Sequence, residues 1–178
     1  MIYRNGTVAQ KRVDSPLSPT VLVPGDGTTT WDNIYHSQNF ELGEGTISEV
    51  SGNAGTTFSL LPANTDGVLE WTVGGGGQSL ILGLSTSLNT SAWNNVKYGI
   101  YMGGTTIIPF ESTFVNSGQL QNGGVEGNVL GVRRQGGVFS YESNGVTFYT
   151  SQLTELGDLY FSVFTFSSGE INTINLQY

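Results

Sequence analysis

The sequence predicts an all-β protein built as an antiparallel sandwich of two sheets. Two alternating runs, Val138–Glu142 and Val146–Thr150, flank Ser143-Asn144-Gly145. Asn-Gly at such a break predicts a two-residue type I′ hairpin, because both turn residues need positive φ. Short apolar runs recur from Asn39 onward, and no segment shows a sustained helical period with caps. Abundant Thr, Ser and Asn and 26 Gly residues also favour strands and tight turns.

The hairpin also predicts which side chains face the interior. A plain two-residue turn sets Tyr141 opposite Phe148. The expected dry face then carries Phe139, Tyr141, Val146 and Phe148, and the wetter face carries Ser140, Glu142, Thr147 and Tyr149. One dry face and one wetter face are typical of an antiparallel sheet that packs against a second sheet.

Twelve strands are expected after the first three dozen residues. They are Asn39–Leu42, Thr46–Ser51, Thr56–Leu60, Val68–Val73, Ser79–Ser85, Val96–Met102, Thr106–Glu111, Val129–Arg134, Val138–Ser143, Val146–Thr150, Leu159–Phe166 and Ile171–Tyr178. Leu80–Leu84 and Leu159–Phe166 are apolar on both faces, which predicts central strands. Trp71 alternates in phase with Leu69 and Val73, so we expect it in the core.

Charge and composition limit the classes of function. Fourteen Asp and Glu against six Lys and Arg give a net charge of −8, so the body should repel phosphate backbones, and we expect no nucleic-acid partner. The chain has no cysteine, which excludes disulfides, thiolate metal sites and a cysteine nucleophile. We expect no signal peptide, because Met1–Gly6 lacks an apolar segment, and no membrane insertion.

Residues 1–37 differ from the remainder and predict an extended arm, followed by a sandwich over residues 38–178. Three of the five prolines lie in this segment, and Ser15–Pro19 is typical of polyproline II structure. Such arms gain order by lying on a partner, so we expect attachment or oligomerisation here; a floppy terminus is the alternative. The attachment candidates are Tyr3, Arg4, Lys11, Arg12, Pro16 and Pro19.

A succession of short motifs points to a known architecture. It runs Gly131-Val132-Arg133-Arg134, Val138-Phe139-Ser140-Tyr141, Asn144-Gly145, Tyr149-Thr150-Ser151 and Leu159-Tyr160. This succession resembles concanavalin A-like jelly-roll domains, nearest to SPRY-like members and to lectin-like modules of bacterial and phage surface proteins. The resemblance spans roughly Leu80 to Leu176 and implies a fold rather than a ligand.

The chain departs from the best-known members of that group. It has neither the clustered Asp/Asn loop of plant-lectin metal sites nor the Glu-x-Asp-x-Glu strand of related glycoside hydrolases. The Pro-containing tail before a Gly- and Thr-rich body also resembles phage head-fibre, decoration and tail-fibre proteins. These resemblances imply a sandwich without catalytic or metal equipment, and we expect no cofactor.

Surface aromatic residues are the candidates for ligand binding. Trp93, Asn94 and Asn95 occupy a polar loop, and Tyr149 is a further surface candidate. Sugar rings stack on such aromatic side chains beside amide hydrogen-bonding groups. The alternative for Trp93 is a loop anchor packed over the edge of the sandwich.

The remaining reactive residues favour structural roles. His36, the only histidine, is expected to be a polar loop residue, so neither a zinc site nor a serine triad is expected. Asp26 and Asp32 bracket an oxygen-rich segment that is read as a turn, with weak calcium binding as the alternative. Arg133 and Arg134 should face opposite ways, one of them exposed and the other held near acids at the sheet rim, in an ion pair with an acid such as Glu142 or Glu126; ligand contact is the alternative.

The sequence therefore predicts a non-enzymatic structural protein of a bacteriophage virion, a head fibre, decoration or tail-associated protein. Its partners would be other virion proteins and further copies of itself, and its lectin-like body would contact host-surface glycans. The alternative is a carbohydrate-binding adhesin module on a bacterial cell surface. A third reading is a glycoside-active enzyme that uses two carboxylates. The candidate acids for that chemistry are Glu70, Glu111, Glu126 and Glu142.

Overall fold

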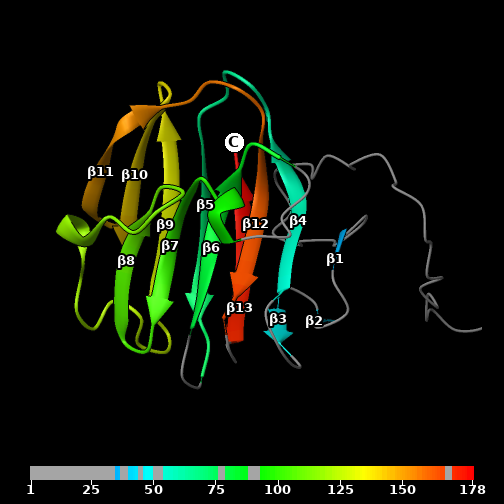
Figure 1. The fold of residues 1–178 in the computed structure, drawn as a ribbon, viewed down its shortest axis with the longest axis vertical. Coiled ribbons are helices and arrows are strands. Elements are labelled where there is room, and N and C mark those ends of the chain that lie inside the picture. The colour runs from blue at the N-terminus through cyan, green and yellow to red at the C-terminus, as the bar shows by residue number, and fades with distance from the viewer. Residues whose placement is uncertain are drawn as a thin grey trace, which may run out of the picture.

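The protein forms two antiparallel β-sheets that pack face to face (Figure 1). The computed structural model describes residues 35–36, 40–43, 46–49, 54–75, 79–87, 93–166 and 170–178. Within these ranges the only helical segments are two short 3₁₀ turns, η1 (Trp93–Asn95) and η2 (Asn116–Gly118). No helix among the described residues is long and apolar enough to cross a membrane.

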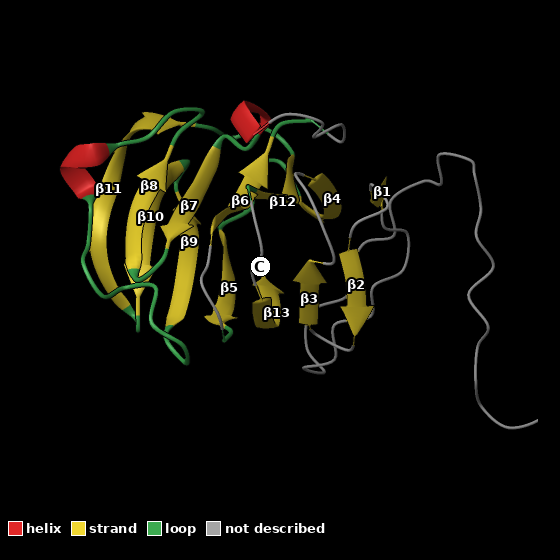
Figure 2. Cartoon of the chain, turned by 60° about the horizontal axis from the view of Figure 1, so that its bottom comes forward, coloured by secondary structure: helices red, strands yellow, loops and turns green. Residues whose placement is uncertain are grey.

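The two sheets contain six and seven strands. The six-stranded sheet has the order β1 (Tyr35–His36), β4 (Ala54–Leu61), β12 (Leu159–Thr165), β6 (Ser79–Ser85), β7 (Tyr98–Gly103) and β8 (Thr106–Phe110). The seven-stranded sheet has the order β11 (Val146–Thr154), β10 (Val138–Ser143), β9 (Val129–Gln135), β5 (Gly67–Val73), β13 (Glu170–Gln177), β3 (Thr46–Glu49) and β2 (Phe40–Gly43). Figure 2 shows the two layers from another side.

The predicted architecture is confirmed. Each of the twelve expected strands is present, with ends shifted by a few residues, and β6 and β12 are the central strands of their sheet. The expectation that His36 lies in a loop is wrong, because Tyr35 and His36 form β1 and pair with Thr57 and Thr56 of β4. The last residues of the 1–37 segment are therefore part of a sheet. Residues 1–34, with all six attachment candidates and with Asp26 and Asp32, lie outside the described residues.

The hairpin between β10 and β11 has the expected turn but not the expected register. Asn144 and Gly145 have φ of 50° and 76°, as a type I′ turn requires. A bulge next to the turn shifts the pairing, so that Tyr141 lies opposite Tyr149 rather than Phe148. Tyr149 consequently packs against the interior, whereas Val146 is 69% exposed, and both of these face assignments were wrong.

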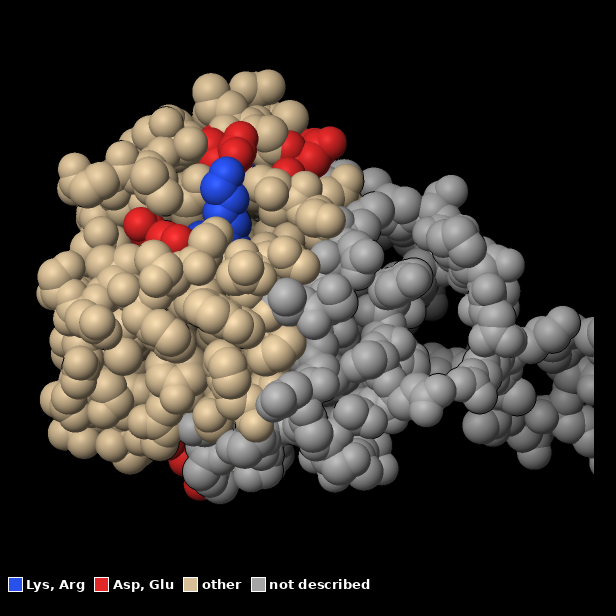
Figure 3. Space-filling view, viewed as in Figure 1, with Lys and Arg blue, Asp and Glu red and all other residues tan. Residues whose placement is uncertain are grey.

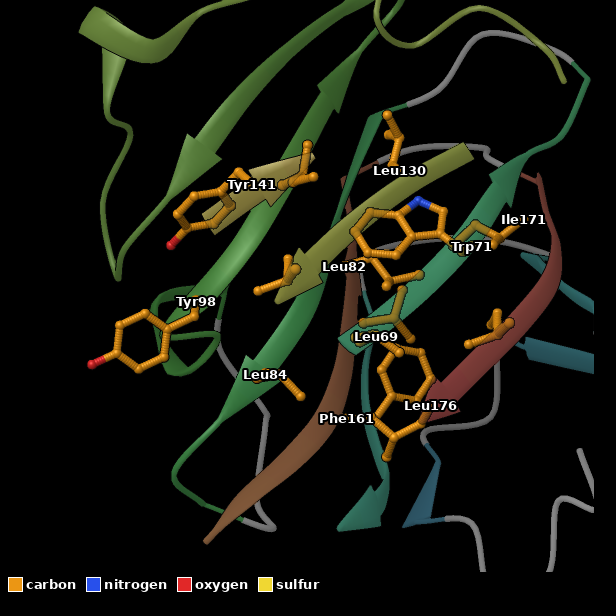
Figure 4. Packing of buried hydrophobic residues seen from close by; sticks show 14 of the residues in the cluster. Leu69, Trp71, Leu82, Leu84, Tyr98, Leu130, Tyr141, Phe161, Ile171 and Leu176 are labelled. Atoms are coloured by element: carbon orange, nitrogen blue, oxygen red, sulfur yellow. The ribbon is translucent and has the colours of Figure 1, made fainter. Parts of the chain in front are cut away.

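The space between the sheets holds a single large apolar cluster (Figure 4). Trp71 is completely buried there, as expected, and its indole N–H has no hydrogen-bond partner. The rings of Tyr98 and Phe139 stack across the two sheets with centroids 3.7 Å apart. Aromatic side chains of this size contribute most of the apolar area that stabilises a sandwich interior.

The outer edge of β8 is covered by the segment that follows it. Ile107 and Leu120 exchange both backbone hydrogen bonds, at 3.0 and 2.9 Å, and so extend the sheet by an isolated bridge. Further along, Gly118 in η2 lies so close to the ring of Tyr149 that a Cβ at this position would approach it to 2.9 Å. The segment therefore links the edges of the two sheets and limits edge-to-edge pairing at β8.

Candidate functional site: an aromatic band on the outer face

The outer face of the six-stranded sheet carries a second apolar cluster. Along β6, Leu80, Leu82 and Leu84 point inward and belong to the interior cluster, while Ile81 points outward. Along β12, Phe161 points inward and Phe164 outward, as strand alternation requires. Strands that are apolar on both faces thus bury one set of side chains in the sandwich and present the other set on the outside.

Six aromatic side chains on this outer face form a continuous series of ring contacts, called here the aromatic band. Its members are Trp93, Tyr101, Phe110, Phe114, Phe164 and Phe166. The centroid distances along the series are 6.0 Å (Trp93–Phe114), 5.1 Å (Phe114–Tyr101), 5.8 Å (Tyr101–Phe166) and 5.2 Å (Phe166–Phe164). Phe110 contacts both Trp93 and Phe114 from below.

The two outermost rings of the band are open to solvent. Trp93 is 38% exposed and Phe114 is 37% exposed, whereas Phe110 beneath them is fully buried. The planes of Trp93 and Phe114 differ by only 19°. The band therefore offers two nearly parallel rings on a buried aromatic support, an arrangement that can receive the flat face of another ring.

A strained turn places Phe114 on the band. Ser112 has a φ of 57°, a left-handed conformation that costs a non-glycine residue about 1–2 kcal/mol. Across this turn the Glu111 N–H donates to the Thr113 carbonyl at 2.8 Å, and Phe114 bridges back to Phe110. Strain of this kind is concentrated at functional sites, where the surrounding structure maintains it.

Neutral polar side chains border the exposed rings. Asn94, next to Trp93, and Ser112 and Thr113, just before Phe114, are all exposed. Figure 3 shows that the described part of this face is largely uncharged, with the charged atoms mainly in the upper part of the view. Two charged residues, Glu111 and Lys97, lie within a few residues of Phe114 and Trp93 in the sequence. The Glu111 carboxylate accepts a hydrogen bond from the Tyr141 hydroxyl at 3.1 Å, and Lys97 pairs with Glu155 at 3.1 Å.

The residues predicted to bind ligand do not form one site. Trp93, Asn94 and Asn95 together make up η1 at one end of the aromatic band. Tyr149 lies on β11 of the other sheet, half-buried against the interior cluster and 5.7 Å from Tyr141 between ring centroids. Sequence reasoning missed Tyr101, Phe110, Phe114, Phe164 and Phe166. The outward positions of the doubly apolar strands were an available signal for Phe164 but not for Phe114.

The acids considered for glycoside cleavage are dispersed or already engaged. Glu70 and Glu142 lie on either side of Gly131 on the outer face of the seven-stranded sheet, and Glu126 lies near Gly75. Glu142 accepts two hydrogen bonds from Arg133, at 2.7 and 3.2 Å. No group of three Asp, Glu, His or Cys residues suited to a metal ion occurs among the described residues.

The two adjacent arginines face opposite ways, as predicted. Arg133 forms the expected ion pair with Glu142, but it is also the more exposed of the two, so the expectation that the exposed and the paired arginine differ is wrong. Arg134 is buried and donates to backbone carbonyls instead, to Thr65 at 2.8 Å, to Gly157 at 2.7 Å and also to Pro62. It therefore ties the end of β9 to two loops, and desolvation lowers its pKa.

The tyrosines inside the sandwich are held in their neutral form. Burial, with the nearby carboxylates of Glu155 and Glu111 adding to the effect, raises the pKa of Tyr98 to about 12. Burial likewise raises the pKa of Tyr141 far above its usual range, with the Glu111 carboxylate adding to the effect. Both side chains belong to the interior cluster and not to the cluster on the outer face.

Comparisons with known proteins identify the architecture. Neither protein-family models nor curated sequences give a match to this chain. Among solved structures, the SPRY domain of human HERC1 matches with a TM-score of 0.54 at 12% identity, covering 76% of this chain and 91% of that one. The carbohydrate-binding module CBM66 from Bacillus subtilis matches with a TM-score of 0.54 at 10% identity (82% and 95% covered).

A third structure, the carbohydrate recognition domain of Emp47p, matches with a TM-score of 0.52 at 11% identity, covering 82% of this chain and 87% of that one. All three are concanavalin A-like sandwiches, so this chain has the fold that its motifs predicted. Identities this low establish the fold alone.

Proposed function

We propose that this protein is a non-enzymatic carbohydrate-binding module whose ligand stacks on the aromatic band. The observation that carries the proposal is the pair Trp93 and Phe114, two nearly parallel and exposed rings at the end of a cluster of buried and partly buried aromatic side chains. Sugar rings present an apolar C–H face that packs on such rings, while their hydroxyls take hydrogen bonds from neighbouring polar groups. Asn94, Ser112 and Thr113 supply such groups beside the rings.

The fold supports this choice over other uses of an exposed aromatic patch. Two of the solved structures that share the fold, CBM66 and the Emp47p domain, are carbohydrate-binding domains by name. Large exposed aromatic side chains are unusual on a monomer surface unless they meet a partner. If no glycan binds, a protein partner would be the alternative ligand of the same patch.

The test is glycan-array binding followed by calorimetry with the oligosaccharide that binds best. We expect Trp93→Ala and Phe114→Ala each to weaken binding by roughly tenfold to a hundredfold, since one stacked ring contributes about 1–3 kcal/mol. Leu153→Ala and Val146→Ala, exposed apolar side chains on β11 of the other sheet, are the matched controls and should bind normally. A blank array, or full binding by both aromatic variants, would remove the proposal.

We also propose that residues 1–37 attach this module to a bacteriophage virion. The support is compositional: half of the six cations and three of the five prolines lie in this segment, ahead of a strongly acidic body. Particles purified from an infected culture should contain the chain by mass spectrometry, and deletion of residues 1–34, which spares β1, should abolish its incorporation while glycan binding persists. Recovery from the bacterial envelope instead would favour an adhesin.

A further inference from the structure

The cations of the described residues are all held by partners within the protein. Of the six Lys and Arg residues, Lys97, Arg133 and Arg134 are described. Lys97 pairs with Glu155, and Arg133 makes a bidentate pair with Glu142. Arg134 is buried and donates to loop carbonyls. The charges of Lys97 and Arg133 are therefore already matched by carboxylates, and Arg134 is shielded from solvent.

The acid that pairs with Lys97 is itself well satisfied. Glu155 accepts hydrogen bonds from the Gly157 N–H at 2.9 Å and from Lys97 at 3.1 Å. These contacts favour its ionised form and lower its pKa below the usual range. Both members of the pair therefore stay charged at neutral pH, and the ion pair with Glu155 holds Lys97 in place.

The described residues that border the two exposed rings, Asn94, Ser112 and Thr113, carry no charge. Glu111 is the acid closest in sequence to Phe114, and it accepts the Tyr141 hydroxyl from the interior side of the sheet. The exposed residues between Glu111 and Phe114 are Ser112 and Thr113, and Asn94 borders Trp93 on the other side. These three residues form the rim of the aromatic band. The rim offers hydroxyl and amide groups, which carry no net charge and form hydrogen bonds with hydroxyl or acetamido groups of a ligand.

We infer that the glycan bound by the aromatic band carries no anionic group, that is, no uronic acid, sialic acid, sulfate or phosphate. This inference rests on the proposed function and narrows it to a class of ligand. An anionic glycan would meet a protein of net charge −8, and among the described residues each accessible cation is already paired with a carboxylate.

The experiment compares glycans that share a backbone and differ only in charge. Suitable pairs are N-acetyllactosamine with and without terminal sialic acid, and dextran and dextran sulfate. In every pair that binds, we expect the anionic member to bind at least roughly tenfold more weakly, because its charge meets no unpaired cation at the described part of the interface. Binding of the neutral member should not change between low and high NaCl concentration.

A charge introduced at the rim of the aromatic band provides a second test of the same inference. Thr113→Lys should restore binding of an anionic member of a pair that the parent protein rejects, and this gain should disappear at high salt. Thr147→Lys, an exposed threonine on β11 of the other sheet, is the matched control and should leave the preference unchanged.

The outcomes separate the two proposals. Preferential binding of an anionic glycan that is lost in Trp93→Ala would overturn the inference that the ligand carries no anionic group and leave the carbohydrate-binding function standing. Absence of binding to every glycan, charged or neutral, would overturn both.

Discussion

The inner and outer faces of the six-stranded sheet are both apolar, yet they differ in how completely their side chains are covered. On the inner face, Phe161 and Leu82 are enclosed by the second sheet and are at most 1% exposed. On the outer face, Phe110 and Phe164 are also buried, but Trp93 and Phe114 next to them remain exposed. Among the described residues, η1 and the turn after β8 place these two rings on this side.

This difference separates what the fold requires from what a ligand would use. The inner cluster is continuous and close-packed, so each of its side chains contributes to the free energy of unfolding. The outer cluster ends in two rings that leave more than a third of their surface in water, and that exposed area contributes nothing to stability. An aromatic surface that stability does not require is available for binding.

The sharpest test of the comparison uses the same substitution on each face. Phe161→Ala should lower the free energy of unfolding by about 3–5 kcal/mol, because it removes a fully buried ring and leaves a cavity. Phe114→Ala should cost only about 1 kcal/mol and should leave the protein folded. Urea denaturation measures both, and equal losses would show that the outer ring is a structural element rather than an open platform.

The two arginines of β9 extend the comparison to polar groups. Arg134→Met should lower the free energy of unfolding by about 3 kcal/mol, because the partly buried carbonyls of Pro62, Thr65 and Gly157 lose their charged hydrogen-bond donor. Arg133→Met should cost at most about 1 kcal/mol, since its ion pair with Glu142 is exposed on one side. Chemical denaturation of both variants at low and high salt measures the difference. A larger loss for Arg133→Met would contradict this description of the two residues.

The interior tyrosines make the free energy of unfolding sensitive to alkaline pH. In the unfolded chain, tyrosines release protons above about pH 10, whereas folded Tyr98, with a pKa of about 12, and Tyr141 stay protonated. The folded state then binds more protons than the unfolded state, so stability present below pH 10 is lost as the pH rises.

Tyr141→Phe tests this dependence. At neutral pH it should cost about 1 kcal/mol through the lost hydrogen bond to Glu111. Above about pH 10 its free energy of unfolding should fall less steeply than that of the parent, by up to about 1.4 kcal/mol per pH unit. Urea denaturation at several pH values measures the slopes, and parallel slopes would show that Tyr141 ionises as freely inside the protein as in the unfolded chain.

The sequence predicted the features of the fold that are encoded locally. Asn144-Gly145 specified its turn because both residues tolerate positive φ, and the apolar runs of β6 and β12 indicated central strands by periodicity alone. The bulge that turns Tyr149 inward carries no such signal. Its position depends on packing against η2, a segment more than 25 residues earlier in the chain.

The candidate site was only partly predictable for the same reason. Trp93 stood out as an aromatic residue in a polar loop, and it lies at one end of the aromatic band. Phe114 is placed there by a left-handed serine, which no residue preference indicates. The partners of Arg134 were equally hidden, since Thr65 and Pro62 lie 69 and 72 residues away in the sequence.

The smallest expected effect concerns the strain that supports Phe114. Ser112→Gly relieves the left-handed conformation but increases the freedom of the unfolded chain, so the free energy of unfolding should rise by no more than about 1 kcal/mol. Ser143→Gly, on strand β10 without a positive φ, is the matched control and should lower it by roughly 0.5–1 kcal/mol. Thermal denaturation of the two variants gives opposite shifts if the turn is strained. Glycine also lets Phe114 leave its position over Phe110, so the glycan affinity of Ser112→Gly should fall although its free energy of unfolding does not. A lower free energy of unfolding in this variant would show that Ser112 is not strained.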